Sequence, residues 1–206
     1  SYFRNTGWEI CGIEPSQNFA GELKAKEIPL VDKLISEISS TEWKALGKFD
    51  VINMSMLLEH VVSPQDTVNK LKSLLKPGGV ITIESPNDFN LLQMAAVETH
   101  TLSLWWINKL HINYFDFNSL EYITSKAGLK PCARDAQFPL ELFLLFGENY
   151  IGNSELGRAT HLKRVALEQN LHATNNDQLL YLMYKKFAEL GLGRTAIVHS
   201  RETSHD

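Results

Sequence analysis

The sequence predicts a single α/β domain built on a doubly wound parallel sheet. Short apolar segments at residues 8–13, 49–54 and 80–84 are typical of strands, and the segments between them have the apolar spacing of helices. Apolar strands that alternate with helices indicate a parallel sheet with helices on both faces. A chain of 206 residues is long enough for one such domain with a sizeable core.

The first half of the chain supplies three of the predicted strands. Residues 8–13 form the first, and Pro15 and Ser16 provide a turn and an N-cap for a helix that runs to about residue 26. Residues 28–48 give a weaker signal and stay unassigned. The strand at 49–54 precedes a helix that begins at Ser63-Pro64 and ends at Pro77-Gly78-Gly79, and the strand at 80–84 follows. One face of that helix is apolar, with Val68, Leu71, Leu74 and Leu75.

The second half of the chain predicts more helix than strand. Asn118 and Glu121 resemble a capping box for a helix that Gly128 closes, and a strand begins at about residue 130. Residues 140–147 are apolar but ambiguous, whereas residues 162–169 and 178–190 are helical in pattern. We expect a helical insertion at about 148–192 before a last strand at 195–200. The second of these helices has an apolar stripe that we expect to be packed, made of Leu179, Met183, Phe187 and Leu190.

Composition excludes several classes of protein. The net charge is −4 and the basic residues are scattered, so the charge pattern of a nucleic-acid-binding protein is absent. No apolar run reaches the roughly 18 residues that a membrane span needs. The two cysteines, Cys11 in an expected buried strand and Cys132 after an expected helix, give neither metal-ligand spacing nor a disulfide framework. We therefore expect a cytoplasmic protein without nucleic-acid or membrane partners.

Glu14 is the first candidate binding residue. It stands between the strand at 8–13 and the helix start, where an acidic residue in an open α/β sheet can accept hydrogen bonds from both hydroxyls of a ribose. The alternative is a surface carboxylate that the dipole of the following helix favours. The residues that follow decide between the two.

The segments "GWEICGIEPS", "FDVINMSMLLEHVVSPQDTVNKLKSLLKPGGVITIESPN" and "HINYFDFNSLEYITSKAGLKP" occur in this order. Together they resemble a class I S-adenosylmethionine-dependent methyltransferase of the bacterial small-molecule type, over about residues 7–135. The resemblance implies a Rossmann-like methyltransferase fold with S-adenosylmethionine as cofactor. It implies that Glu14 binds the ribose between Ile13 and Pro15, and that residues after the strand at 49–54 line the methionine end: Asn53, Met54, Ser55 and Met56. The adenine-binding residue, expected around residues 34–40, is not placed.

The chain departs from this family at its beginning. The family's glycine-rich loop follows the first strand, and here that loop and strand should precede residue 1, while residues 1–6 look like the end of the next helix. No G-x-G-x-G occurs in the sequence. We therefore expect a sheet that is incomplete at the N-terminus, in a partial methyltransferase domain spanning residues 1–206.

Two histidines are the candidate catalytic residues. Methyl transfer to a hydroxyl requires removal of a proton, and the ordinary pKa of histidine, about 6.5, suits this step. His60 follows the cofactor-lining strand, and His111 lies in a loop that the resemblance places over the pocket. Each could instead be structural: His60 at a helix start, and His111 as a loop contact. Glu59 and His60 fall short of a metal-ligand set, so no metal site is predicted.

The aromatic residues Trp105, Trp106, Tyr114 and Phe115 form either an acceptor pocket or lid, or core and oligomer contacts. We predict methyl transfer from S-adenosylmethionine to a small-molecule or saccharide-like acceptor, at oxygen, with His60 or His111 as the base. A homodimer is compatible with the sequence. The alternatives are a non-catalytic or degenerate cofactor-binding module and a nicotinamide-dependent oxidoreductase.

Overall fold

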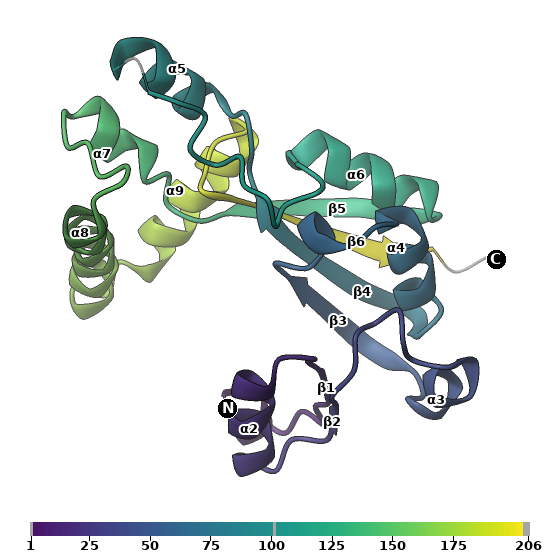
Figure 1. Cartoon of the computed structure of the whole chain (residues 1–206). Coiled ribbons are helices and arrows are strands. Elements are labelled where there is room, and N and C mark those ends of the chain that lie inside the picture. Colours follow the sequence, from purple (N-terminus) through teal and green to yellow (C-terminus); the bar gives the residue numbers. More distant parts are fainter. Residues whose placement is uncertain (1, 101, 204–206) are drawn as a thin grey trace. The chain divides into compact units, whose positions relative to one another are not determined.

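The computed structural model describes residues 2–100 and 102–203, with the side chain of residue 2 left aside, and is shown in Figure 1. The chain divides into two compact units, Ser1–Gly47 and Lys48–Asp206, which are described separately here. This division does not test the prediction that residues 1–206 form a single domain. Among the described residues, no helix combines the length and the apolar character needed to cross a membrane.

The first unit contains two very short parallel strands and three helices. Strand β1 (Gly12–Ile13) pairs with β2 (Leu30–Val31), and the helices are α1 (Tyr2–Asn5), α2 (Gln17–Ala25) and α3 (Ser40–Ala45). The predicted helix after Ser16 is confirmed as α2. The predicted strand at 8–13 is wrong except at its end, because β2 offers a ladder of only two residues. Cys11 is therefore exposed rather than buried.

The first unit has little core of its own. Its described buried residues are Ala20 and Ile38, while Phe19 is 61% exposed. Trp8 contacts Phe3 edge to face, with ring centroids 6.1 Å apart, and its backbone N–H donates to the carbonyl of Phe3 at 3.1 Å. A capping box at Ser39 and Glu42 starts α3, so local hydrogen bonds rather than packing define this part of the chain.

The second unit is built on a four-stranded mixed sheet in the order β3-β4-β6-β5. The strands are β3 (Phe49–Ser55), β4 (Leu75–Pro86), β5 (Leu129–Ala136) and β6 (Thr195–Glu202). Strand β4 runs parallel to β3, with Ile52 opposite Ile81, and β6 runs antiparallel to both β4 and β5. The expected α/β sheet is confirmed. Its two parallel strands bring their carboxyl ends to the same edge, which is where ligands bind in such sheets.

Helices of the second unit cover the sheet and extend beyond it (Figure 1). They are η1 (Leu58–His60), α4 (Pro64–Lys72), α5 (Leu91–His100), α6 (Phe117–Lys126), α7 (Glu141–Leu145), α8 (Ser154–Ala173) and α9 (Asp177–Glu189). Helix α4 contacts α6, and α9 packs against β5. Fully buried side chains of the sheet and these helices make the core, among them Leu58, Val68, Ile81, Ile83 and Leu120.

Several element boundaries differ from the predicted ones. Helix α6 begins two residues earlier than expected, because Asp116 is the N-cap and forms the capping box with Ser119. Glu121 instead makes a two-point ion pair with Arg134 of β5, at 2.6 and 2.7 Å. Residues 75–79 begin β4 rather than ending the preceding helix, and Cys132 lies within β5, exposed.

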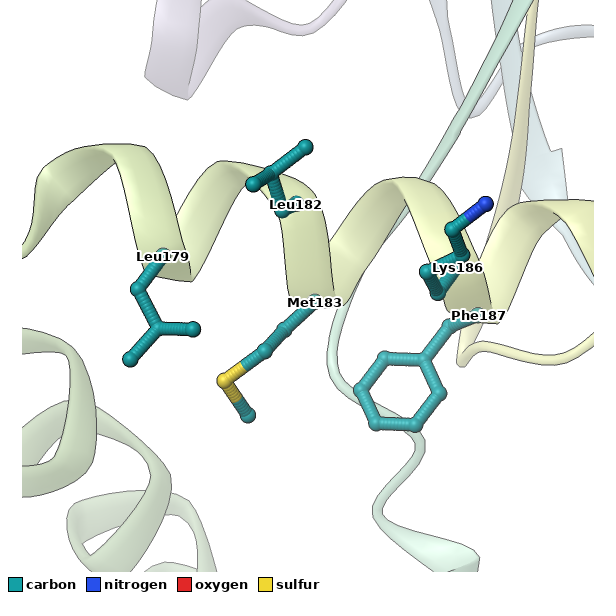
Figure 2. Close-up of a pocket in the computed structure, with 5 residues that line it drawn as sticks. All are labelled: Leu179, Leu182, Met183, Lys186 and Phe187. Carbon is teal, nitrogen blue, oxygen red and sulfur yellow. The ribbon is translucent and has the colours of Figure 1, made fainter.

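The apolar stripe of α9 is packed only in part. Leu190 is 66% exposed and Leu179 is 48% exposed, so the prediction of a packed face is wrong for these two residues. Figure 2 shows that the stripe instead lines a shallow surface pocket, formed by Leu179, Leu182, Met183, Lys186 and Phe187. Lys186 is the one titratable group among them, and it pairs with Glu189. The pocket therefore offers no chemistry of its own.

Candidate active site

Glu14 lies where the first unit's strand ends. It directly follows β1, and its backbone N–H donates to the carbonyl of Val31, 3.1 Å away. Its Oε1 accepts the N–H of Ser16 at 2.8 Å, which fixes the carboxylate at the start of α2. No partner is recorded for Oε2 within the described part of the chain. A half-buried carboxylate with one oxygen held and one open fits the hydroxyls of a ribose. Ile13 and Pro15 flank it in sequence.

The predicted methionine-end residues lie in the second unit, at the end of β3. Asn53 and Ser55 are exposed, whereas the side chain of Met54 is buried and belongs to the core. Ser55 Oγ donates to Glu84 Oε2 at 2.8 Å. Because this group and Glu14 belong to different units, the structure describes them as two separate groups.

Left-handed backbone marks the ends of both parallel strands of the second unit. Met56, just after β3, has φ 51°, and Phe89, in the loop after β4, has φ 57°. An unbranched or aromatic side chain in this region is strained, and such residues cluster at functional sites. Met56 is nevertheless held in place, since its N–H donates to the carbonyl of Glu84 at 3.0 Å. The strain therefore coincides with the edge at which a ligand is expected.

Glu59 is the most deeply buried acid at this edge. Its side chain is 1% exposed, and its Oε2 accepts a hydrogen bond from Ser85 Oγ of β4 at 3.1 Å. Its Oε1 lies 3.9 Å from Nε2 of His60. Among the described residues, His60 is the ion-pair partner of the Glu59 carboxylate, and no lysine or arginine lies within ion-pair distance of it. A buried carboxylate needs compensation by a proton or a cation.

His60 and His111 lie side by side, although 50 residues separate them in sequence. Their ring centroids are 5.0 Å apart in an edge-to-face arrangement. Nδ1 of His60 is 2.8 Å from the carbonyl oxygen of Leu110. Because a carbonyl oxygen can only accept, Nδ1 carries the proton, and Nε2 of a neutral His60 has a free lone pair. Nδ1 of His111 is buried and has no hydrogen-bond partner among the described residues.

Backbone and amide hydrogen bonds hold the two histidine segments together. The N–H groups of Ile112 and Asn113 donate to the carbonyl of Glu59, at 2.9 and 3.2 Å. The side-chain amide of Asn113 donates to the carbonyls of Leu58, at 3.1 Å, and Val61, at 2.7 Å. The spacing of residues in the sequence does not predict these hydrogen bonds. They are the reason why the two histidines lie next to each other.

A second set of buried polar groups follows β4. Asp88 is 4% exposed, and burial together with the negative charges of Glu59 and Glu141 raises its pKa to about 6. Burial also raises the pKa of Glu141, on α7. Asn87 donates to the carbonyls of Gly191 and Gly193, at 3.0 and 3.1 Å, and so fixes the turn before β6. One oxygen of each of these three side chains has no partner among the described residues.

The predicted aromatic cluster forms around Phe89. The rings of Trp106 and Tyr114 contact Phe89 edge to face, at 5.4 and 5.9 Å, and Trp105 contacts Trp106 at 4.8 Å. Tyr114 also lies 6.3 Å from His111, so the cluster is continuous with the histidine pair. Phe115 is buried and serves the core.

Sequence reasoning found the histidines but missed the acids around them. The sequence pattern presents Glu59 only as part of an insufficient metal-ligand set, and the predicted site includes neither Asp88 nor Glu141. The strand ending in Ser85-Pro86-Asn87 was a usable signal, because polar residues directly after a buried strand lie at the ligand edge. No such signal marks Glu141, because it lies in residues 140–147, whose secondary structure the sequence leaves ambiguous.

Comparisons with known proteins concern the family and the fold of the chain. A family model described as a methyltransferase domain matches residues 1–133. An S-adenosylmethionine-dependent methyltransferase structure from Archaeoglobus fulgidus is similar with a TM-score of 0.59 at 14% identity, covering 98% of this chain and 79% of its own. One from Thermotoga maritima, described as a possible histamine N-methyltransferase, has a TM-score of 0.54 at 12% identity, covering 98% and 77%.

A third structure contains the product form of the cofactor. The 1,6-didemethyltoxoflavin-N1-methyltransferase of Burkholderia thailandensis, with its substrate and S-adenosylhomocysteine bound, has a TM-score of 0.50 at 12% identity, covering 98% of this chain and 65% of its own. At such identities these likenesses show the fold. No curated protein matches the sequence.

Proposed function

The chain belongs to the family of methyltransferase domains whose model matches residues 1–133, and from that premise we propose that it methylates a hydroxyl group of a small-molecule acceptor. It is an S-adenosylmethionine-dependent methyltransferase, with S-adenosylmethionine as its cofactor. The family model that matches the chain is that of a methyltransferase domain and not that of a nicotinamide-dependent oxidoreductase. We propose the hydroxyl as the methylated group, a small molecule as the acceptor, and a role for each of the site residues named below.

The observation that carries the proposal is the histidine pair beside a buried carboxylate. A hydroxyl is a poor nucleophile until it loses its proton, so O-methylation needs a proton acceptor next to the reacting oxygen. The Nε2 lone pair of His60, whose Nδ1 is held by Leu110, is oriented for this step. We rank His60 first as the base and assign His111, with the adjoining aromatic cluster, to acceptor binding.

Glu14 has the cofactor role in this proposal. Its open oxygen and its position after β1 support a hydrogen bond to the ribose, with Ile13 and Pro15 on either side. Asn53, Met54, Ser55 and Met56 are proposed for the methionine end, through backbone and exposed polar groups, since the Met54 side chain is buried. When bound, S-adenosylmethionine supplies an activated methyl group, and the protein has to align it with the acceptor oxygen.

An amine acceptor is the second candidate, favoured by the unpartnered buried oxygens of Asp88 and Glu141. Two buried acids near one another suit a ligand with several N–H donors or a positive charge. Two of the similar structures are also N-methyltransferases by description, one of them as a possible one. We place the hydroxyl first because a hydroxyl has to lose its proton before methyl transfer, which the histidine lone pair can accept, whereas an amine acceptor depends less on such a base.

Paired acceptors test this proposal. The protein is incubated with S-adenosylmethionine that carries a labelled methyl group and with phenol against aniline, or a methyl hexoside against the matching amino-hexoside. Formation of labelled methyl ethers supports the proposal, whereas label on the amines alone overturns it in favour of the second candidate. We also expect a cytoplasmic enzyme, and a homodimer stays a prediction to be checked by sedimentation.

A further inference from the structure

Three metal-ligating side chains meet at the histidine pair. Glu59, His60 and His111 each direct one ligand atom into a group in which all these atoms lie within 4.8 Å of one another. Two of the three come from η1, and the third comes from the loop between α5 and α6. The sequence showed only the adjacent Glu59 and His60, which are too few for a site.

The hydrogen bonds around the group leave two of its atoms, Nε2 of a neutral His60 and Oε1 of Glu59, without a donor among the described residues. Nδ1–H of His60 is committed to Leu110, so Nε2 presents a lone pair, and the Glu59 Oε1 that faces it at 3.9 Å is also an acceptor. That separation is too long for a hydrogen bond. The buried Nδ1 of His111 has no recorded partner in the described chain. A proton on Nε2 of His60 or a bound cation can supply the positive charge that this carboxylate, 1% exposed, needs, and the unpartnered buried nitrogen of His111 favours the cation.

We propose that Glu59, His60 and His111 bind a divalent transition metal ion of the Zn²⁺ type. Two imidazoles and one carboxylate suit such an ion, and three protein ligands leave positions open for a further ligand. The contact of His60 with the Leu110 carbonyl is the outer hydrogen bond that metal-bound histidines usually make. In a tetrahedral site, bonds of about 2.0–2.2 Å place neighbouring ligand atoms about 3.3–3.6 Å apart, so separations of up to 4.8 Å have to shorten by at most about 1.2–1.5 Å.

This inference rests on the proposed function only for the place of the acceptor. A hydroxyl that takes an open position on the ion loses its proton more easily, because the positive charge lowers the pKa of a bound oxygen group. His60 and His111 would then act as ligands, the ion would lower the pKa of the bound hydroxyl, and the released proton would pass to water rather than to a free imidazole. Binding of the ion itself is independent of which acceptor is methylated.

The test is a titration of metal-free protein with Co²⁺, followed by visible absorption, and with Zn²⁺, followed by calorimetry. We expect one ion per chain and the absorption of a nitrogen- and oxygen-ligated Co²⁺. Glu59→Gln, His60→Gln and His111→Gln should each weaken binding by at least about 10–100-fold. His172→Gln is the matched control, because His172 is exposed and pairs with Asp177, outside the cluster.

Folding is checked by circular dichroism, since Glu59 is buried and Glu59→Gln is the variant most prone to misfold. His111→Gln keeps the test valid in that event, because His111 lies in a loop and is only half buried. Absence of Co²⁺ binding in the wild type overturns the proposal, as does binding that all folded variants retain. Neither result affects the labelled-methyl assay, so a failed metal site and a failed proposed function remain distinguishable.

Discussion

The two units each place a glutamate after a strand, and they use it differently. Glu14 follows a ladder of two residue pairs, is half buried, and has one carboxylate oxygen without a hydrogen-bond partner among the described residues. Glu59 follows a strand in a four-stranded sheet and is 1% exposed, against two imidazoles. The same residue type thus suits reversible binding of hydroxyls in one place and charge compensation in the other. Burial, which the sequence shows only indirectly, separates the two roles.

The largest expected effect concerns the group formed by Glu59, His60 and His111. His60→Gln should lower turnover by about 10²–10⁴-fold, because it removes either the base or a ligand of the ion that lowers the pKa of the acceptor hydroxyl. Affinity for S-adenosylhomocysteine, measured by calorimetry, should hardly change. If His60 is the base, His111→Gln should act mainly on acceptor affinity, visible as a raised KM, whereas if both histidines hold the ion, His111→Gln should lower turnover as well. Full turnover in both variants would place the proton's route elsewhere, and His172→Gln should match the wild type.

The next effect sharpens the comparison of the two cores. Leu120→Ala, at a side chain with no exposed surface on α6, should lower the free energy of unfolding by about 2–5 kcal/mol. Phe19→Ala in the first unit should change it by less than about 0.5 kcal/mol, because Phe19 is largely exposed. Urea unfolding measures both. A large loss in Phe19→Ala would show that this side chain is covered in solution.

The same contrast explains what the sequence could predict. The strands at 49–54 and 195–200 were found because their side chains are apolar and their partners lie in a full sheet, so local pattern and tertiary environment agree. The strand at 8–13 was overestimated, since strand formation depends on a partner that the local pattern does not reveal. His60 and His111 were each identified, but their meeting depends on Asn113 and on backbone bonds to Glu59. These hydrogen bonds leave no periodic pattern in the sequence.

Asp88 gives a smaller effect with a definite pH dependence. Its pKa is raised to about 6, so the folded state favours the neutral acid, and the resulting stability is fully present below about pH 4 and is lost as the pH rises through about 6. Asp88→Asn, which cannot ionise, should therefore be more stable than the wild type by up to about 3 kcal/mol at pH 7 and by less than about 1 kcal/mol at pH 4. Urea unfolding at both pH values measures the difference. An equal difference at the two values would show that Asp88 does not titrate in this range.

The smallest effect tests the first unit's glutamate. Glu14→Ala should weaken binding of S-adenosylhomocysteine to the full-length protein by about 10–100-fold, since a carboxylate hydrogen-bonded to hydroxyls contributes about 1.5–3 kcal/mol. Glu22→Ala is the matched control, because Glu22 lies on the neighbouring α2, is exposed, and pairs with Lys26. The unfolding free energy should stay nearly constant in both variants, since neither glutamate belongs to a core. Calorimetry at one pH compares all three proteins. Unchanged affinity in Glu14→Ala would remove Glu14 from the cofactor site and reduce it to a carboxylate that holds the N–H of Ser16 at the start of α2.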